Sequence, residues 1–305
     1  MDYSLIEALC IECGAAFERD ALLSRHCSMR IGGACDILVK PNSEEMLRSL
    51  LATCRGEGIP FFLLGRGSNV LFSDEGYRGC VILLGQEMGG VAVEGSRITA
   101  GAGTALSAVC SAALENGLTG LEFAYGIPGS VGGALFMNAG AYGGEMKDVV
   151  TSCRYIDENG EFQEMSAEEM NLSYRHSVFS ERDFVITSVT LRLSEGDKAA
   201  IKVRMDELMQ KRRDKQTVFF FYHYVFYRFL YFFDVLISRR QPVRKFLKRV
   251  RKRAFRRRNK GFYHVFERRL QRRYFPLVKV QKIDGVRKVR VSHPENPFYR
   301  NSDKA

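Results

Sequence analysis

The chain has 305 residues, of which 46% are hydrophobic, enough to bury the core of one large domain or of two. Its net charge of +11 would by itself suggest a nucleic-acid or membrane partner, but residues 1–216 carry −9 and residues 217–305 carry +20. The eight cysteines all precede residue 217 and stand apart from one another, so composition argues against a secreted, disulfide-stabilised protein. We therefore expect reduced thiols, no signal peptide and a cytoplasmic location.

The N-terminal segment predicts a helix. Residues 1–25 mix Leu, Ile, Ala and Glu at helical spacing, and we expect a packing helix at residues 1–19, ahead of the main domain. Cys10 and Cys13 form a C-x-x-C pair on this helix. A zinc site needs a second ligand pair of similar spacing, and none follows, so we interpret the pair as chance spacing and expect no metal.

Strands and helices alternate from residue 36 to residue 216 and predict an α+β domain. Short apolar runs predict strands, whereas longer runs with helical spacing predict helices. Ser43, followed by two glutamates, is typical of a helix N-cap. The predicted strands are 37–39, 61–64, 80–84, 90–94, 96–100, 152–156, 162–165 and 184–193. The predicted helices are 43–54, 104–116 and 199–215.

Two glycine-rich clusters predict a ligand site. The first is Gly65-Arg66-Gly67-Ser68-Asn69-Val70-Leu71, after a predicted strand. The second is Gly126-Ile127-Pro128-Gly129-Ser130-Val131-Gly132-Gly133, followed by Asn138-Ala139-Gly140-Ala141-Tyr142-Gly143. Glycine turns free backbone N–H groups, which bind pyrophosphate without a positive side chain. Such turns also serve tight packing, but two of them in one chain favour ligand binding.

A third glycine run, Gly101-Ala102-Gly103-Thr104-Ala105-Leu106, follows a predicted strand and opens a predicted helix. A dinucleotide-binding Rossmann fingerprint would have its third glycine where Leu106 stands. No acidic residue that ends a second strand follows at the usual distance. We interpret this run as a helix-entry turn.

Four motifs in this order resemble the UDP-N-acetylenolpyruvoylglucosamine reductase family. They are Arg30-Ile31-Gly32-Gly33, the first two glycine clusters, and Tyr174-Arg175-His176-Ser177-Val178-Phe179. The resemblance covers about residues 20–216. It implies an FAD-binding domain of the vanillyl-alcohol-oxidase (PCMH) type, in which two α+β subdomains hold FAD, with a substrate-binding domain after it.

The resemblance also implies a reaction. In the family, NADPH reduces FAD, and the flavin then reduces UDP-N-acetylglucosamine enolpyruvate to UDP-N-acetylmuramate for peptidoglycan synthesis. Carried over by motif, Arg175 is the catalytic cation that stabilises the enolate-like intermediate, and Tyr174 lines the substrate site. The expected partner is a UDP-sugar, without nucleic acid or membrane, in a monomeric protein. The residues implied to bind FAD are Gly65, Arg66, Gly67, Ser68, Asn69, Val70, Leu71, Gly126, Ile127, Pro128, Gly129, Ser130, Gly132, Gly133 and Asn138.

Residues 217–305 depart from the family pattern. The family would continue with a proline-containing turn, a Ser-Ala-Gly-Ser-x-Phe-Lys motif that holds the proton-donating serine, and a catalytic glutamate. The segment has three serines, none of them in that context, and two glutamates. We assign neither a proton donor nor a second acid here, and we predict weak flavin binding and loss of reductase activity.

Three explanations stay open for this basic, aromatic segment. Residues 217–238 have the length of a membrane span but contain ionisable side chains that are costly in a bilayer. Residues 239–273 have the Arg and Lys density, with interleaved aromatics, of a nucleic-acid arm. The abrupt change in composition favours the third explanation, translation out of the native frame after Gln216. The alternative function is an FAD-domain relic whose basic tail binds nucleic acid or an anionic membrane. A flavin oxidase is a further alternative, but His26 and His176 lie within reductase-like motifs and offer no covalent attachment site.

Overall fold

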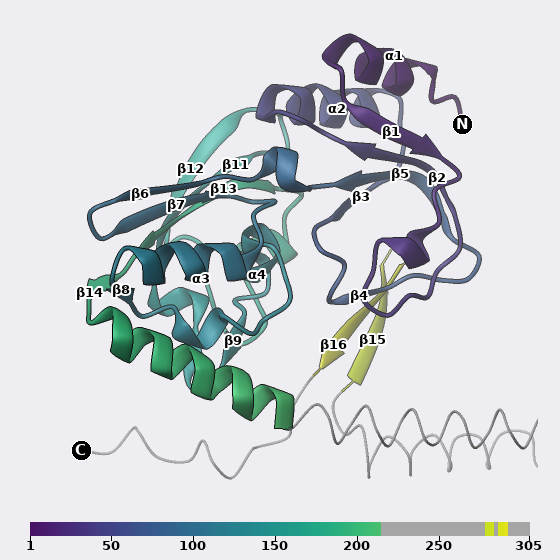
Figure 1. The fold of residues 1–305 in the computed structure, drawn as a ribbon. Coiled ribbons are helices and arrows are strands. Elements are labelled where there is room, and N and C mark those ends of the chain that lie inside the picture. Colours follow the sequence, from purple (N-terminus) through teal and green to yellow (C-terminus); the bar gives the residue numbers. More distant parts are fainter. Residues whose placement is uncertain (215–277, 284–285, 292–305) are drawn as a thin grey trace, which may run out of the picture. The chain divides into compact units, whose positions relative to one another are not determined.

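The computed structural model describes residues 1–214, 278–283 and 286–291 (Figure 1). One compact unit contains residues 1–212 and residues 282–287, and its two main sheets are described here by themselves. Later in the chain, β15 (Val278–Ile283) and β16 (Val286–Val291) are neighbouring strands. The predicted aberrant segment 217–305, with its candidate membrane span and nucleic-acid arm, otherwise lies outside the described residues. Within those ranges, no helix combines the length and the apolar character needed to cross a bilayer.

The first sheet has the strand order β1-β2-β5-β3. Its strands are β1 (Ala16–Arg19), β2 (Cys35–Lys40), β3 (Phe61–Leu64) and β5 (Tyr77–Leu83). Both β2 and β3 run parallel to β5, and parallel strands are usually covered on both faces, which explains the continuous apolar run in β2. Successive side chains of β2 enter different cores, because Ile37 and Val39 face one cluster and Leu38 faces another.

Two helices, α1 (Ser4–Cys13) and α2 (Glu44–Gly56), lie together over one face of this sheet (Figure 1). The predicted N-cap of α2 is confirmed, because Ser43 Oγ accepts a hydrogen bond of 3.1 Å from the Met46 N–H. The buried positions of α2 recur at helical spacing: Met46, Leu47, Leu50, Leu51 and Cys54. The helix predicted over residues 43–54 is therefore confirmed, and its buried face anchors this layer.

The N-terminal helix is shorter than predicted. Gly14 adopts φ +64°, and the backbone N–H groups after Cys13 turn back onto the carbonyls of Cys10 and Ile11, which ends α1. Residues 16–19 then pair with β2 as the antiparallel strand β1. The prediction of a helix over residues 1–19 is thus wrong beyond Cys13, because edge pairing with β2 competes with the helical pattern.

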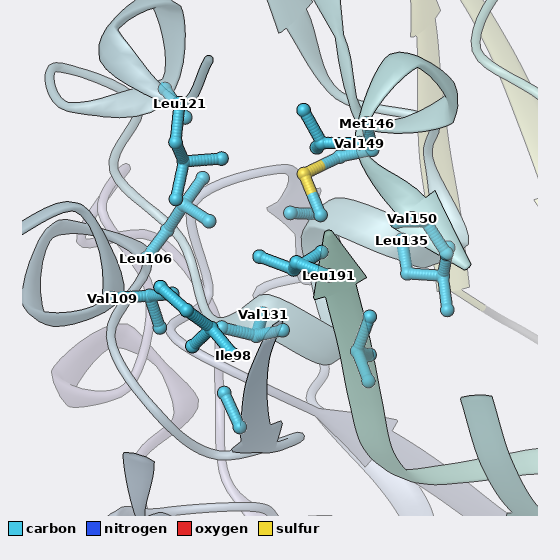
Figure 2. Packing of buried hydrophobic residues seen from close by; sticks show 14 of the residues in the cluster. Ile98, Leu106, Val109, Leu121, Val131, Leu135, Met146, Val149, Val150 and Leu191 are labelled. Atoms are coloured by element: carbon cyan, nitrogen blue, oxygen red, sulfur yellow. The ribbon is translucent and has the colours of Figure 1, made fainter. Parts of the chain in front are cut away.

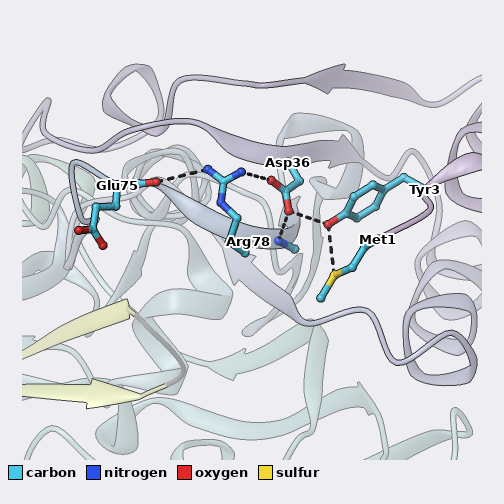
Figure 3. Close-up of polar contacts among 6 residues, drawn as sticks. Met1, Tyr3, Asp36, Glu75 and Arg78 are labelled. Atoms are coloured by element: carbon cyan, nitrogen blue, oxygen red, sulfur yellow. Dashed lines mark hydrogen bonds and ion pairs between the residues drawn. The ribbon is translucent and has the colours of Figure 1, made fainter.

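Asp36 on β2 ties the N-terminus to the first sheet (Figure 3). Its carboxylate accepts hydrogen bonds from the Tyr3 hydroxyl at 2.7 Å, from the Gly79 N–H at 2.9 Å and from Arg78. Burial, together with the hydrogen bond to Asp36, raises the pKa of Tyr3. These bonds join the start of α1, β2 and β5, so Asp36 has a structural role.

The second sheet is antiparallel, with the order β12-β11-β13-β7-β6. Its strands are β6 (Val91–Glu94), β7 (Arg97–Gly101), β11 (Val150–Ile156), β12 (Phe162–Ser166) and β13 (Val185–Arg192). The helices α3 (Leu106–Glu115) and α4 (Val131–Phe136) lie on one side of it, and a further helix spans residues 198–214 (Figure 1). The α+β prediction, with two subdomains, is confirmed.

The core of this second subdomain holds α4 in place. Val131 and Leu135 are fully buried, and they lie among Ile98, Leu106 and Leu191 from the sheet and from α3 (Figure 2). Burying a side chain of this size contributes roughly 1.5–3 kcal/mol, so α4 is fixed by its apolar residues although it is short.

The shorter elements complete the description. The short strands are β4 (Val70–Leu71), β8 (Leu118–Thr119), β9 (Gly140–Ala141), β10 (Gly144–Glu145) and β14 (Ser194–Glu195). Short 3₁₀ helices lie at Leu23–Arg25, Gln86–Met88, Glu122–Ala124, Met146–Asp148 and Val178–Ser180.

We expect one rapidly reacting thiol per native chain. Cys13 is exposed, whereas the other seven cysteines are buried, and burial raises the pKa of Cys10 and Cys35 to about 11. Buried thiols that stay protonated at pH 8 react slowly with disulfide reagents. Titration with Ellman's reagent should release one equivalent at once and eight after denaturation, and Cys13→Ser should remove the fast one. Two fast equivalents would contradict the packing of α1.

Candidate functional site

The two glycine clusters come together in space. A Cβ atom at Gly65 would lie 2.5 Å from Ser130 Oγ, and one at Gly129 would lie 3.8 Å from Ser68 Oγ. Gly65 follows β3 of the first sheet, whereas Ser130 precedes α4 of the second subdomain. The candidate site is therefore assembled from loops of both subdomains.

The first loop has free backbone donors. Gly67 adopts φ +63°, and its carbonyl accepts a hydrogen bond of 2.9 Å from the Ser28 N–H. Within residues 1–214 and the two C-terminal strands, no backbone acceptor takes a hydrogen bond from the N–H groups of residues 66–69. Successive free N–H groups around a left-handed residue form the kind of concavity that binds anions.

The second loop uses most of its N–H groups for its own fold. Val131 donates to the Thr104 carbonyl at 2.9 Å, Gly132 donates to the Ala102 carbonyl at 3.0 Å, and Gly133 donates to Ser130 Oγ at 3.3 Å. In the part of the chain that the structure describes, the N–H groups of Gly126, Gly129 and Ser130 stay without an acceptor. The expectation of an anion-binding nest across residues 126–134 thus narrows to the N–H groups of Gly126, Gly129 and Ser130.

Asn138 has its side chain committed to the protein. It is 3% exposed with φ +39°, and its Nδ2 donates to Glu145 Oε2 at 2.6 Å and to the Ser173 carbonyl at 3.0 Å. Its Oδ1 accepts a hydrogen bond of 2.9 Å from the Lys147 N–H. Contact between Asn138 and a cofactor stays a prediction, whereas the structure gives this amide a positioning role.

Tyr174 and Arg175 occupy the tip of a tight turn. Ser173 and His176 exchange two backbone hydrogen bonds of 3.1 Å, and Arg175 between them adopts φ +55°. The turn is anchored by Ser177, fully buried, whose Oγ donates to the Phe136 carbonyl at 2.7 Å, at the end of α4. The motif that contains Arg175 is therefore fastened to the same helix that follows the second glycine loop.

The charge of Arg175 is not neutralised within the described residues, where no carboxylate forms an ion pair with it. Its Cζ atom lies 6.0 Å from the ring centroid of Tyr174, which is 63% exposed. An unpaired guanidinium beside an exposed phenol ring suits an anionic ligand with an apolar or sugar portion. Both side chains are available to a substrate.

Arg212 is a residue of this region that the sequence did not single out. A Cβ atom at Gly126 would lie 2.7 Å from Arg212 Nε, and Arg212 Cζ lies 5.9 Å from the ring centroid of Tyr142. The available signal was helical spacing, because Ile201, Met205 and Leu208 are buried and Arg212 follows at the next turn. In the sequence, Arg212 stands between Lys211 and Arg213, so its residue type alone does not distinguish it.

Comparison with known proteins places this geometry in a family. The family model described as FAD binding domain matches residues 35–166. UDP-N-acetylenolpyruvoylglucosamine reductase of Clostridium novyi is 46% identical over 201 residues, which are 66% of this chain and 65% of that protein. The crystal structure of the corresponding reductase from Thermus caldophilus has a TM-score of 0.57 at 35% identity, over 65% of this chain and 70% of that chain. This chain belongs to the UDP-N-acetylenolpyruvoylglucosamine reductase family.

The match to the reductase family is partial in length. The Clostridioides difficile member is 44% identical over 201 residues, which are 66% of each chain. The aligned part of the chain thus spans slightly less than two thirds of the length of these curated relatives, 65% and 66%. The suspected membership is confirmed, and with it the FAD-binding PCMH-type fold of the described domain.

The residues present fit the FAD of this reductase family. The loops that carry the free N–H groups of residues 66–69 and of residues 126, 129 and 130 lie next to each other, and the absence of a Cβ at Gly65 lets Ser130 approach. Such donors match the phosphate oxygens of the cofactor. The Arg175 turn, which is fastened to α4, supplies none of these N–H donors, so its side chains are available for contacts other than those with the phosphates.

Proposed function

We propose that the protein binds FAD between its two glycine loops and acts in the reduction of UDP-N-acetylglucosamine enolpyruvate to UDP-N-acetylmuramate. The juxtaposition of Gly65 and Ser130, with free N–H groups on both sides of it, is the observation that carries this proposal. Family membership supports the choice of cofactor and of substrate class. NADPH is the proposed source of the hydride.

Each loop has a separate part in holding FAD. The N–H groups of residues 66–69 would donate to the diphosphate from the first loop, and those of Gly129 and Ser130 would donate to it from the second. When bound, FAD supplies the hydride carrier between NADPH and the enolpyruvyl group. The remaining predicted contacts are close to these groups in the chain: Gly65, Val70, Leu71, Gly126, Ile127, Pro128, Gly132, Gly133 and Asn138.

Arg175 is the proposed catalytic cation. Its planar guanidinium can hold the substrate carboxylate with two hydrogen bonds, and it stabilises the negative charge that develops on that group during hydride addition. The left-handed turn and the Ser177 anchor fix the backbone at Arg175, which limits the positions that the guanidinium can take. Tyr174 at the same tip is the proposed substrate-lining residue.

We further propose that substrate turnover is impaired in this chain. Residues 217–305 contain no Ser-Ala-Gly-Ser-x-Phe-Lys sequence, so the family's proton-donating serine has no counterpart by motif. The domain organisation that follows is a PCMH-type domain at residues 20–216 and an atypical segment at residues 217–305. A monomeric, cytoplasmic protein without a nucleic-acid or membrane partner belongs to the same proposal.

The proposal is tested by the visible spectrum of the purified full-length chain and by its response to NADPH. We expect a bound-flavin spectrum after incubation with FAD, anaerobic bleaching by NADPH, and slow or absent reoxidation by the enolpyruvyl UDP-sugar. Arg175→Met should leave flavin binding within about twofold of wild type, as should Arg182→Met, an exposed control. A chain that takes up no FAD contradicts the proposal, and rapid turnover contradicts the impairment.

A further inference from the structure

We infer that Arg212 supplies a cation to a diphosphate subsite at the second glycine loop. The inference deepens the proposed function and rests on it, because the diphosphate esters of that function are FAD and the UDP-sugar. Neither the glycine clusters nor the Tyr174–Phe179 motif includes this residue, and it lies on the last turns of the helix that spans residues 198–214.

The fold directs Arg212 toward the loop. Ile201, Met205 and Leu208 are buried on one face of the helix, and Arg212 is four positions beyond Leu208 on that face. The side chain lies against the backbone of Gly126, where an added Cβ would be 2.7 Å from Nε and 2.9 Å from Cδ. A residue with a side chain at position 126 would therefore displace the guanidinium.

The guanidinium has a donor without an acceptor. Arg212 Nε is a buried side-chain nitrogen with no hydrogen-bond partner among the described residues, and no carboxylate of those residues forms an ion pair with Arg212. A guanidinium is always charged, so this donor cannot be relieved by losing its proton. Buried donors without partners are rare in native proteins because they cost free energy, and one beside a ligand loop points to an acceptor that the ligand brings.

The loop defines the chemistry of that acceptor. Gly126 is three residues before Gly129, whose N–H and that of Ser130 are free for an anion. The planar fork of an arginine matches phosphate oxygens, and the contact of Arg212 with the Tyr142 ring limits the orientations that it can take. A diphosphate ester fits a site in which one cation and several N–H groups converge.

The test compares Arg212→Met with Lys211→Met in the full-length chain. Lys211 is exposed on the same helix, so its substitution removes the same charge without touching Gly126. We would measure the melting temperature of the ligand-free proteins, and the Kd for FAD and for UDP-N-acetylglucosamine. We expect Arg212→Met to raise one of the two Kd values at least tenfold, while its melting temperature without ligand stays at or above that of Lys211→Met.

The result identifies the ligand. Weakening of FAD alone assigns the subsite to the cofactor, and weakening of UDP-N-acetylglucosamine alone assigns it to the sugar nucleotide. A lower melting temperature with both Kd values unchanged would show a packing role and overturn the inference, while FAD binding by the wild type would preserve the proposed function. A wild-type chain that binds neither ligand would overturn both.

Discussion

Replacing Gly67 with alanine is expected to abolish FAD binding and to lower the free energy of unfolding by about 3 kcal/mol or more. Gly67 has φ +63°, and a Cβ there would lie 2.1 Å from the His26 carbonyl oxygen and 2.7 Å from Cys27 Cα. Both neighbours are backbone atoms, which cannot turn aside as a flexible side chain can. The first glycine loop would have to move, and its free N–H groups would move with it.

Gly58 provides the matched control. It has the same φ of +63° and nothing within 4 Å of an added Cβ, so Gly58→Ala measures the cost of the left-handed conformation alone. That cost is about 1–2 kcal/mol, with no effect on the site. Urea unfolding and fluorescence titration with FAD would give both quantities for each variant. Equal stabilities and equal Kd values for the two variants would show that the loop does not need glycine at position 67.

Replacing Asn138 with aspartate is expected to destabilise the protein by on the order of 3 kcal/mol at pH 7 and to release the Arg175 turn. The substitution removes two N–H donors and places a carboxylate against Glu145 Oε2 and the Ser173 carbonyl, both of them acceptors. Like charges in a site that is 3% exposed repel strongly. Hydrogen exchange should accelerate at residues 173–177, and urea unfolding gives the stability.

Asn171→Asp is the control for that change. Asn171 has a positive φ of +48°, and Asn138 has a similar φ of +39°, but Asn171 is exposed. The same chemical change at Asn171 should therefore alter the free energy of unfolding by less than about 0.5 kcal/mol. Comparable losses in the two variants would mean that the hydrogen bonds of Asn138 contribute little. A large loss confined to Asn138→Asp, with faster exchange at the turn, would confirm its positioning role.

The sequence predicted the elements whose pattern is local. The run Ile37-Leu38-Val39 and the cap at Ser43 each contain their own signal, and the structure has a strand and a helix start at those positions. The glycine clusters and the Tyr174–Phe179 motif also stood out, because their residue types are unusual. Their meeting in space is a property of the fold, which the resemblance supplied and local pattern did not.

The features that could not be predicted from the sequence depend on contacts between distant segments. The N–H groups of Val131 and Gly132 are occupied because the chain returns to Thr104 and Ala102, and nothing near position 131 indicates this. The strand at residues 16–19 forms because β2 offers an edge, against the local helical pattern. Arg212 differs from the basic residues beside it in sequence only in the face of the helix on which it lies.

The pairing of β13 with β7 sets an order for cotranslational folding. The strand pairing of the first sheet involves only residues up to Leu83, whereas the second sheet closes when Val185–Arg192 pairs with β7 and β11. Ala102, whose carbonyl accepts a hydrogen bond from Gly132 of the second glycine loop, donates its own N–H to the Thr187 carbonyl, so this bond forms only after Thr187 has been synthesised. On the ribosome, one wall of the cofactor site can therefore form long before the other. The nascent chain acquires a complete binding site only after the last strand of the sheet has emerged.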